Sequence, residues 1–596
     1  MKLKDWIVVI FCSLWVALFS NYAFAPTSQS YLVWFAPWGL FYLERRYRAE
    51  YKKLFWIGCL LAIVFYSVSF QWILHMTVTF GGFPLFLALP IFFLSAVFLN
   101  LWFPFFLVGF SFLVTKLRRE FAFIAGFVAL LGEFATPQIF PWYWGSIVAG
   151  NIFLAQTAEY MSIYGLTFFL FIGSYLSFTL IGRDIFNFLL SLPKMPKIHW
   201  SRISSLKFFG RELLVISLFW IVGFSLYWKW NQVKPTDWVD TLVIQPNAPL
   251  EFRDGRSVAE TMLDLMTRIE QLTLEGAASS SDPVDLVVLP ESGVPFFSAH
   301  KHSATISPPL YWERFDALMK IISNRLNANV FFNELDASYV DEKVRTRKNL
   351  RYYNSSTVYD PNGDRISSYQ KVYLLAFGEY MPFEFLYDLS PQTGRFEPGK
   401  NLDFLPIYSK SSEADVKAEA NEGIQNNDFK HLSFEQTANV KIEEVLEKYK
   451  TFRQTTVERA RFLPLICYEV IIPEFVRTFK QSGNPDFIVN VTNDKWYGIS
   501  AETYQHGDLG RIRSIEWRKW MVRSTNSGSS FFVDHLGRVV DNEFTGQESS
   551  EFIRKKVGVI KSEHTFYVRY GNSLVWSLLM ILASYFSWIY WRTKRA

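Results

Sequence analysis

The sequence predicts a multi-span helical membrane domain joined to a large α/β domain, and three observations support this fold class. Half of the 596 residues are hydrophobic and 18% are aromatic, which is more than a soluble enzyme of this size usually carries. Long apolar stretches fill residues 1–230, and another lies within 573–596. Between them, residues 231–572 alternate short β-rich runs with amphipathic helical stretches.

The apolar runs predict about eight transmembrane helices. A helix needs ~20 residues to cross the bilayer, so the run at 31–44 is short. The run at 84–116 contains Pro90 and Pro104 and is either one kinked helix or two segments. The predicted spans lie near residues 6–24, 31–44, 54–75, 84–116, 120–136, 155–181, 211–229 and 573–591.

The positive charges predict the orientation of these spans. A cleaved signal peptide is the alternative interpretation of the first run, because Lys2 and Lys4 precede it and Ala-Phe-Ala ends it. If the run is retained and the N-terminus is cytoplasmic, lysines and arginines cluster on the inside, for example at 45–53, 116–119 and 592–595. The loops predicted outside, 25–30, 76–83 and 137–154, contain no Lys or Arg. This pattern places residues 231–572 on the outer side of the membrane, with both termini in the cytoplasm.

Charge and cysteine content exclude some functions. The net charge of +5 is small, and no dense basic face indicates a nucleic-acid partner. Cys12 and Cys59 lie in apolar runs, which leaves Cys467 as the single cysteine of the polar part, without a disulfide partner there. It is either a buried structural thiol or a reactive one. Eight scattered histidines give no metal-ligand spacing, so we expect no metal or cofactor.

The polar part predicts an α/β domain in which strands alternate with helices. The second hairpin turns at His535–Gly537, and the first turns at Pro-Asn-Gly-Asp. Residues 409–460 are rich in Ser, Glu, Lys, Asn and Gln, and predict an inserted, partly helical and mobile segment without a catalytic role. The predicted strands are 240–245, 285–291, 329–335, 462–469 and 486–493; the helices are 255–275 and 309–327; the hairpins are 356–371 and 530–541.

Three reactive side chains stand at the ends of predicted strands. Glu291 follows VVLP, Lys371 follows the first hairpin, and Cys467 lies near the end of FLPLICYE. Charged groups at the ends of buried strands are candidate site residues. Because 80 and 96 residues separate them, only the fold could bring them together. Spacing alone leaves open whether they form one site.

Four segments show a family resemblance: LPESG (289–293), QKVYLLAFGEYMPFE (370–384), ICYEVIIPEFVR (466–477) and NVTNDKWYG (490–498). They resemble the nitrilase (carbon-nitrogen hydrolase) superfamily of Glu-Lys-Cys enzymes. With the membrane spans and RSTNSGSSFFVDHLGRV (523–539), they resemble the apolipoprotein N-acyltransferase family over nearly the whole chain. The resemblance implies an αββα sandwich, and a bacterial inner-membrane location with the catalytic domain in the periplasm.

The resemblance also implies a ping-pong acyl transfer. The sn-1 acyl chain of a phospholipid, typically phosphatidylethanolamine, passes to Cys467 as a thioester and then to the N-terminal amine of a diacylglyceryl-cysteine lipoprotein. A thiol is nucleophilic as the thiolate, and forming the thiolate requires a base or a positive neighbour. Glu291 is therefore expected to take the proton of the Cys467 thiol. Lys371 is expected to stabilise the oxyanion, with the backbone N–H of Tyr468 as a second donor. We expect the protein to act as a monomer.

Other matched residues are expected to have supporting roles. Glu379 is a fourth site carboxylate, against the alternative of an ordinary surface residue. Tyr468 and Glu469 are expected to shape the pocket, and Asp494 is as readily a turn residue. His506 and Arg523 are expected to be structural hydrogen-bonding groups. The predicted substrate contacts are Asn493, Asp494, Trp496, Trp142 and Trp144, of which the last two also suit a membrane interface.

Two departures from the family pattern keep rival functions open. The segment 409–460 is longer than expected, and in QPNAPLEFRDGRS (245–257) Phe252 is the only aromatic residue where relatives often carry a tryptophan. One rival is a membrane-tethered nitrilase-like amidase that uses water as the second nucleophile. The other is a non-catalytic, lipoprotein-binding relative.

Overall fold

The computed structural model describes two compact units. Unit 1 comprises Met1–Val233, Ser500–Arg518 and His564–Ala596, and unit 2 comprises Lys234–Ile499 and Lys519–Glu563. The described residues are 2–79, 81–138, 140–191, 210–250, 257–294, 309–341, 343–344, 349–384, 387, 394–410 and 455–595.

The regular secondary structure in the described residues of unit 1 is entirely helical. Its longest helices have apolar central stretches, with charged residues toward their ends, as expected of segments surrounded by lipid and by one another. The helices are α1 (Leu3–Ala23), η1 (Ser30–Trp34), α2 (Trp38–Arg46), α3 (Tyr51–Ser69), α4 (Trp72–Thr79), α5 (Leu85–Phe98), α6 (Trp102–Leu117), α7 (Ala122–Ala135), α8 (Trp144–Val148), α9 (Ile152–Ala155), α10 (Ala158–Ser177), η2 (Phe178–Gly182), α11 (Arg183–Ser191), α12 (Gly210–Asn231), α19 (Glu502–Trp517), α20 (Phe566–Tyr570) and α21 (Ser573–Arg595).

Six helical segments of the described chain have the length and composition to cross a membrane, so the predicted count of about eight is not confirmed. The run at 31–44 forms η1 and the nine-residue α2, because Pro37 separates them. The run at 120–136 forms the 14-residue α7, which at 1.5 Å per residue is about 21 Å long. The six segments are Leu3–Ala23, Tyr51–Ser69, Leu85–Leu117, Ala158–Leu190, Gly210–Asn231 and Ser573–Arg595.

A buried ion pair joins α10, α12 and α19 within unit 1. Nε of Arg518, directly after α19, donates to Oε2 of Glu159 over 2.6 Å, and Nε1 of Trp230 donates to the same oxygen over 2.7 Å. Arg518 is fully buried, and its Nη1 also donates to Gln156 Oε1 over 2.5 Å. One carboxylate therefore balances one guanidinium between three helices.

Unit 2 contains two β-sheets, each with a parallel centre. The six-stranded sheet has the order β11-β1-β2-β3-β4-β5, and the five-stranded sheet has the order β10-β9-β8-β7-β6. Its elements are β1 (Asp237–Gln245), α13 (Val258–Ala278), β2 (Leu286–Val288), α14 (Pro309–Leu326), β3 (Asn329–Tyr339), β4 (Leu350–Tyr359), β5 (Arg365–Gln370), β6 (Leu405–Lys410), β7 (Thr456–Ile466), η8 (Cys467–Ile471), α18 (Pro473–Thr478), η9 (Phe479–Ser482), β8 (Phe487–Thr492), η10 (Asp494–Tyr497), β9 (Trp520–Thr525), β10 (Phe531–Val533), η11 (Val540–Asn542) and β11 (Glu551–Val559).

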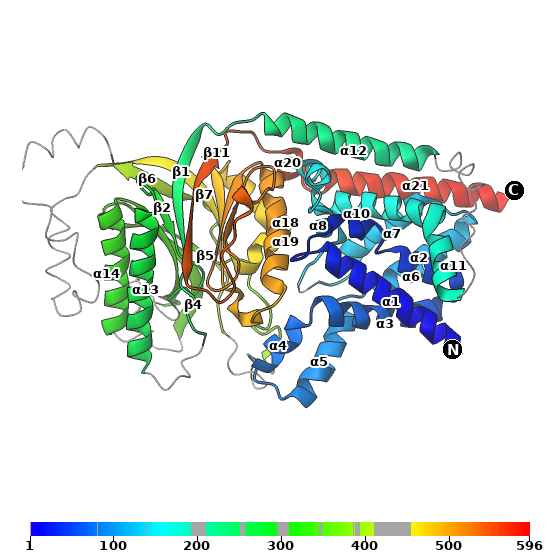
Figure 1. Ribbon diagram of the computed structural model, residues 1–596, viewed down its shortest axis with the longest axis horizontal. Helices are drawn as coiled ribbons and strands as arrows, with labels where there is room; N and C mark the ends of the chain where they lie inside the picture. The colour runs from blue at the N-terminus through cyan, green and yellow to red at the C-terminus, as the bar shows by residue number, and fades with distance from the viewer. Residues whose placement is uncertain are drawn as a thin grey trace, which may run out of the picture. The chain divides into compact units, whose positions relative to one another are not determined.

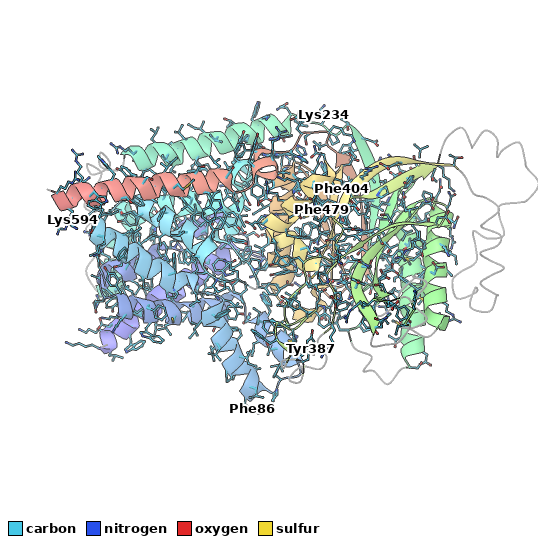
Figure 2. All side chains as sticks on the ribbon, turned by 180° about the vertical axis from the view of Figure 1, so that it is seen from behind. Phe86, Lys234, Tyr387, Phe404, Phe479 and Lys594 are labelled. Carbon is cyan, nitrogen blue, oxygen red and sulfur yellow. The ribbon has the colours of Figure 1, made fainter. Side chains whose placement is uncertain are left out.

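The two sheets pack face to face, which confirms the predicted α/β sandwich. Phe331 on β3 and Phe462 on β7 join the facing surfaces, with ring centroids 4.9 Å apart. Phe404, directly before β6, stacks instead on Phe479 of η9, and both are labelled in Figure 2. Helices α13 and α14 lie beside each other on the outer face of the six-stranded sheet (Figure 1). Strands β1–β2–β3 and β7–β8–β9 are parallel, so the carboxyl ends of each set lie at one edge of its sheet.

The predicted strands and hairpins form with shifted ends. The strand predicted at 462–469 ends at Ile466, because the chain turns at Cys467. The hairpin predicted at 356–371 is β4–β5, while that at 530–541 returns only through the bridge between Val533 and Val539. Residues 409–410 and 456–460 of the predicted insertion belong to β6 and β7, which pair up to Lys410 and Thr456. Of the rest, Thr455 directly precedes β7, and residues 411–454 lie outside the described residues.

Candidate active site

Glu291 lies three residues after the end of β2 and is held there by a polar turn. The next residue, Ser292, has a left-handed φ of 52°, and its N–H donates to Asn333 Oδ1 over 2.9 Å. Nδ2 of Asn354 on β4 donates to Glu291 Oε1 over 2.7 Å, and the N–H of Asn493 donates to Oε2 over 3.1 Å. One carboxylate oxygen is therefore held from β4 of the six-stranded sheet, and the other from the residue directly after β8 of the five-stranded sheet.

Lys371 lies directly after β5 and is 1% exposed. Its backbone N–H donates to the Asn354 carbonyl over 2.8 Å, which continues the β4–β5 pairing past the end of the strand. Its Nζ is 2.9 Å from Glu379 Oε2, 3.0 Å from Glu379 Oε1 and 3.6 Å from Glu291 Oε1. Asn354 Nδ2 also donates to Glu379 Oε1 over 2.9 Å. The ammonium and the Asn354 amide thus join two carboxylates into one cluster.

Cys467 occupies the turn at which β7 becomes η8. Its backbone has a left-handed φ of 53°, a conformation that costs a non-glycine residue roughly 1–2 kcal/mol. The residue is 9% exposed, and its thiol is hydrogen-bonded to the Glu291 carboxylate. A strained conformation at a buried thiol beside a carboxylate is typical of a catalytic turn.

The electrostatics of the cluster follow from burial and from an excess of negative charge. Burial raises the pKa of Glu291 and outweighs the lowering effect of the Lys371 charge. Burial, and then the charge of Glu291, raises the pKa of the Cys467 thiol well above its usual value. Burial alone would lower the pKa of Lys371, but Glu379 and Glu291 outweigh it and raise that pKa. The site therefore favours a neutral thiol beside a permanently charged ammonium.

Glu469 joins the nucleophile turn to the segment that follows Lys371. The carboxylate is fully buried and accepts four hydrogen bonds, from Tyr369 Oη and from the N–H groups of Val372, Tyr373 and Ile466, over 2.8–3.0 Å. Burial raises the pKa of Glu469 to about 7. Because its oxygens are engaged by these donors, Glu469 orients the backbone on both sides of the site.

The remaining predicted residues of unit 2 have varied surroundings. Tyr468 is buried, with its ring 5.8 Å from that of Tyr373. Asn493 caps η10 by accepting from the Lys495 N–H, and its own N–H contacts Glu291. Asp494 is paired with buried Arg523 over 2.8 Å, whereas Trp496 is 42% exposed on the same turn. Asn493 thus has a direct hydrogen bond to the cluster.

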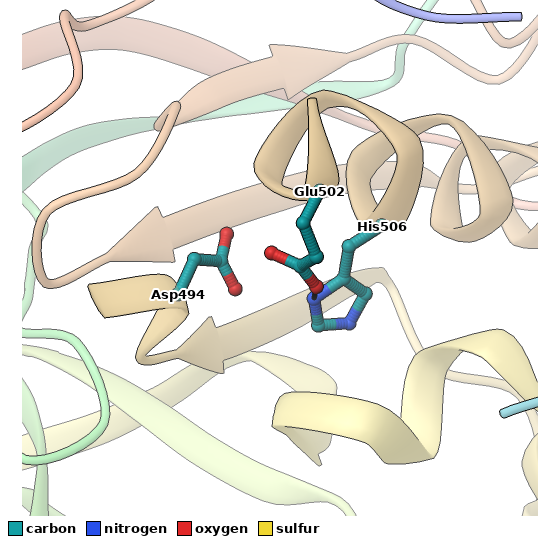
Figure 3. A group of neighbouring side chains, drawn as sticks. All are labelled: Asp494, Glu502 and His506. Carbon is teal, nitrogen blue, oxygen red and sulfur yellow. Dashed lines mark ion pairs between the residues drawn. The ribbon is translucent and has the colours of Figure 1, made fainter. Parts of the chain in front are cut away.

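Three predicted residues belong to unit 1 and are described there. Trp144 is 1% exposed and packs against Trp102, and Trp142 stacks on Phe65 with centroids 4.7 Å apart. Their contact with substrate stays a prediction. His506 is buried on α19, one turn after Glu502, with Nδ1 3.5 Å from the Glu502 carboxylate (Figure 3).

Sequence reasoning missed the amide and hydroxyl groups around the cluster. Asn354 contacts both Glu291 and Glu379, and Asn490 and Thr492 on β8 lie behind Cys467. The only available signal was the occurrence of polar residues inside otherwise buried strands, in the runs NSS and VNVT. Such residues must be hydrogen-bonded, but the pattern does not identify their partners.

Comparison with known proteins defines the class and then the family. The carbon-nitrogen hydrolase family model matches residues 244–588, and the model of the apolipoprotein N-acyltransferase N-terminal domain matches residues 6–176. The chain therefore combines a carbon-nitrogen hydrolase domain with an N-terminal region that matches a second family model. It belongs to the apolipoprotein N-acyltransferase family, and it is a multi-pass membrane protein.

The relatives cover almost the whole chain. Apolipoprotein N-acyltransferase 2 of Leptospira interrogans is 48% identical over 578 residues, which are 97% of this chain and 95% of the relative. Apolipoprotein N-acyltransferase of Bdellovibrio bacteriovorus is 24% identical over 92% of this chain and 89% of its own length. Among solved structures, a nitrilase-superfamily amidase from Nesterenkonia is 14% identical, covers 58% of this chain and 98% of its own, and has a TM-score of 0.34.

Proposed function

We propose that the protein transfers an acyl chain from a membrane phospholipid to the N-terminal amine of a diacylated lipoprotein, with Cys467 as the nucleophile. Phosphatidylethanolamine is the expected donor, through its sn-1 chain. Two kinds of support converge: the family of the full-length relatives, and the cluster of Glu291, Lys371, Glu379 and Cys467. The cluster is the observation that carries the proposal, because its members come from separate strands and loops.

In the first half-reaction, Cys467 Sγ attacks the ester carbonyl carbon of the phospholipid while its proton moves to the Glu291 carboxylate. Because the pKa values of both groups are raised, proton transfer accompanies the attack rather than preceding it. The Lys371 ammonium stabilises the oxyanion, with the Tyr468 N–H as second donor. The C–O bond then breaks, and the departing lysophospholipid oxygen takes the proton from Glu291, which leaves a thioester.

In the second half-reaction, the lipoprotein amine attacks the thioester carbon. Its proton moves to Glu291, the C–S bond breaks, and the sulfur is reprotonated as the amide product forms. Glu379 binds Lys371 more closely than Glu291 does, so it holds the ammonium in place while Glu291 gains and loses a proton. The two carboxylates thus have separate functions around one cation.

We further propose that residues 231–572 form the catalytic region on the periplasmic side, with residues 1–230 and 573–596 spanning the inner membrane. The distribution of Lys and Arg among the loops supports this orientation and places both termini in the cytoplasm. An orientation of this kind fits the chemistry, because both substrates carry acyl chains and reach the enzyme from the bilayer.

The test is to trap the thioester. Full-length protein in detergent micelles is incubated with phosphatidylethanolamine that carries an alkyne on its sn-1 chain, and label on Cys467 is measured before and after hydroxylamine. Wild type should show hydroxylamine-sensitive label, and Cys467→Ala should show none. Cys12→Ala, which removes a buried thiol of α1, is the matched control and should label like wild type.

Two results would contradict the proposal in different ways. Turnover of small amides by wild type without any lipid label would indicate the amidase instead. The second result is complementation of a strain depleted of its own acyltransferase. If Cys467→Ala restores growth as well as wild type does, the protein is a non-catalytic lipoprotein-binding protein.

A further inference from the structure

A second buried network contacts the Cys467 turn from β8 and β9. Its centre is Arg523 on β9, which is fully buried. Nη1 of Arg523 donates to Asn490 Oδ1 over 2.6 Å, and Nη2 donates to Asp494 Oδ2 over 2.8 Å. The guanidinium therefore links β9 to the strand and turn that lie next to the nucleophile.

The first branch of the network reaches the backbone of Cys467. The amide oxygen of Asn490 accepts from Arg523, so the amide nitrogen of Asn490 points away from the guanidinium. Asn490 Nδ2 donates to the carbonyls of Leu465 and Cys467, each over 3.3 Å. Cys467 has a left-handed φ, which ordinary residues avoid. The Asn490 amide thus holds the backbone on both sides of the strained position.

The second branch reaches the sulfur. Thr492 Oγ1 donates to Asp494 Oδ1 over 3.0 Å, and the same hydroxyl is a hydrogen-bond partner of the Cys467 thiol, a contact that lowers the pKa of the thiol against the effect of burial. A hydroxyl has one hydrogen, so Asp494 and the sulfur compete for it. The ion pair with Arg523 makes the Asp494 carboxylate a weaker hydrogen-bond acceptor for the Thr492 hydroxyl. The hydroxyl is therefore more available to donate to the Cys467 sulfur.

We propose that Arg523 is a positioning residue for Cys467 and acts through two intermediaries, the Asn490 amide and the Asp494–Thr492 pair. The network holds the nucleophile turn in its strained conformation and supplies a hydroxyl hydrogen to the sulfur as it becomes a thiolate. A buried ion pair is seldom the most stable way to fill a core, which favours a role in orientation over one in stability. The inference rests on the proposed function of Cys467 as nucleophile.

The test measures thiol reactivity separately from acyl transfer. In a Cys12→Ala, Cys59→Ala background, Cys467 of the full-length protein is alkylated with iodoacetamide, and kcat and KM are measured for lipid transfer. Thr492→Val keeps the shape but removes the hydroxyl, and it should slow both alkylation and kcat about tenfold, with KM within about twofold. Thr492→Ser restores the hydroxyl and should recover both rates.

The matched control is Thr241→Val. Thr241 is a fully buried threonine on β1 whose hydroxyl donates to the Val239 carbonyl, so its loss should change stability without changing either rate. Asn490→Asp provides a second variant, because a carboxylate oxygen facing the Cys467 carbonyl should repel it and lower kcat. Unfolding midpoints identify variants that fail to fold.

Two outcomes would overturn the inference. One is alkylation and kcat of Thr492→Val at wild-type rates, and the other is an equal loss in Thr241→Val. Failure of the proposed function would give a different result from failure of this inference. In that case the wild type forms no thioester, while the alkylation rates still report on the network.

Discussion

The two units each bury an ion pair, and the pairs differ in their balance of charge. In unit 1, one carboxylate, Glu159, faces one guanidinium, Arg518, and further donors occupy the same oxygen. In unit 2, two carboxylates, Glu291 and Glu379, share the single ammonium of Lys371. In the first arrangement one carboxylate has one cation, whereas in the second two carboxylates compete for one cation beside a thiol.

This difference separates a structural pair from a reactive one. A buried ion pair with complete partners is strongly destabilised when one partner is removed, because the other charge is then left buried and unpaired. A carboxylate that competes for a shared cation has a perturbed pKa and accepts a proton more readily. We therefore infer a catalytic role for Glu291 and a structural role for Glu159, and three predictions test this inference.

The largest expected effect comes from Glu291→Gln. The amide has nearly the same shape but cannot accept the thiol proton, so kcat should fall about a thousandfold in single-turnover acylation by labelled phospholipid. Glu270→Gln is the control, because Glu270 is a buried carboxylate of α13 paired with Arg325 outside the cluster. Retention of a tenth or more of wild-type kcat by Glu291→Gln would remove this residue from the role of base.

Glu159→Gln should affect stability instead of chemistry. Breaking a buried ion pair by neutralising one partner costs about 3–5 kcal/mol, so the unfolding midpoint in detergent should fall clearly. The folded fraction should keep the kcat of wild type within about twofold, because Glu159 belongs to unit 1. A hundredfold loss of kcat at unchanged stability would contradict the comparison.

The smallest effect is a shift in pH dependence. Because the pKa of Glu291 is raised, the base is lost as pH falls through a value above that of an ordinary glutamate, and acylation should decline there. The Glu379 charge contributes to that raised pKa, so Glu379→Gln should move the acid limb to lower pH. A pH series of single-turnover rates measures the limb, and a shift to higher pH would show that another group controls it.

Much of the fold could be predicted because its signals are local. Buried apolar runs identified β1, β2, β3 and β8, and Pro-Asn-Gly-Asp identified the turn between β4 and β5. The number of transmembrane helices was less predictable, because the hydropathy of the sequence does not show that Pro37 divides one apolar run into two short helices. Nor does it show that α7 is too short to match the others.

The sequence predicted the reactive residues of the site, but it did not predict the polar side chains that surround them. Glu291, Lys371 and Cys467 each follow a strand, and the family motifs indicate that they come together. Asn354, Asn490 and Thr492 occupy strand interiors, where a polar residue signals only that some partner exists. Which partner it has depends on the pairing of β4 with β5 and of β7 with β8, and this pairing is a property of the whole domain.

The β6–β7 pairing has a practical consequence for engineering. Lys410 and Thr456 are direct partners in the ladder, so the long intervening stretch leaves and re-enters the sheet at neighbouring points. Closing a shorter connection between such points costs little entropy. The position therefore offers a site at which to graft a fluorescent reporter or an affinity handle, or to splice in a minimal turn, while the strands on either side keep their register.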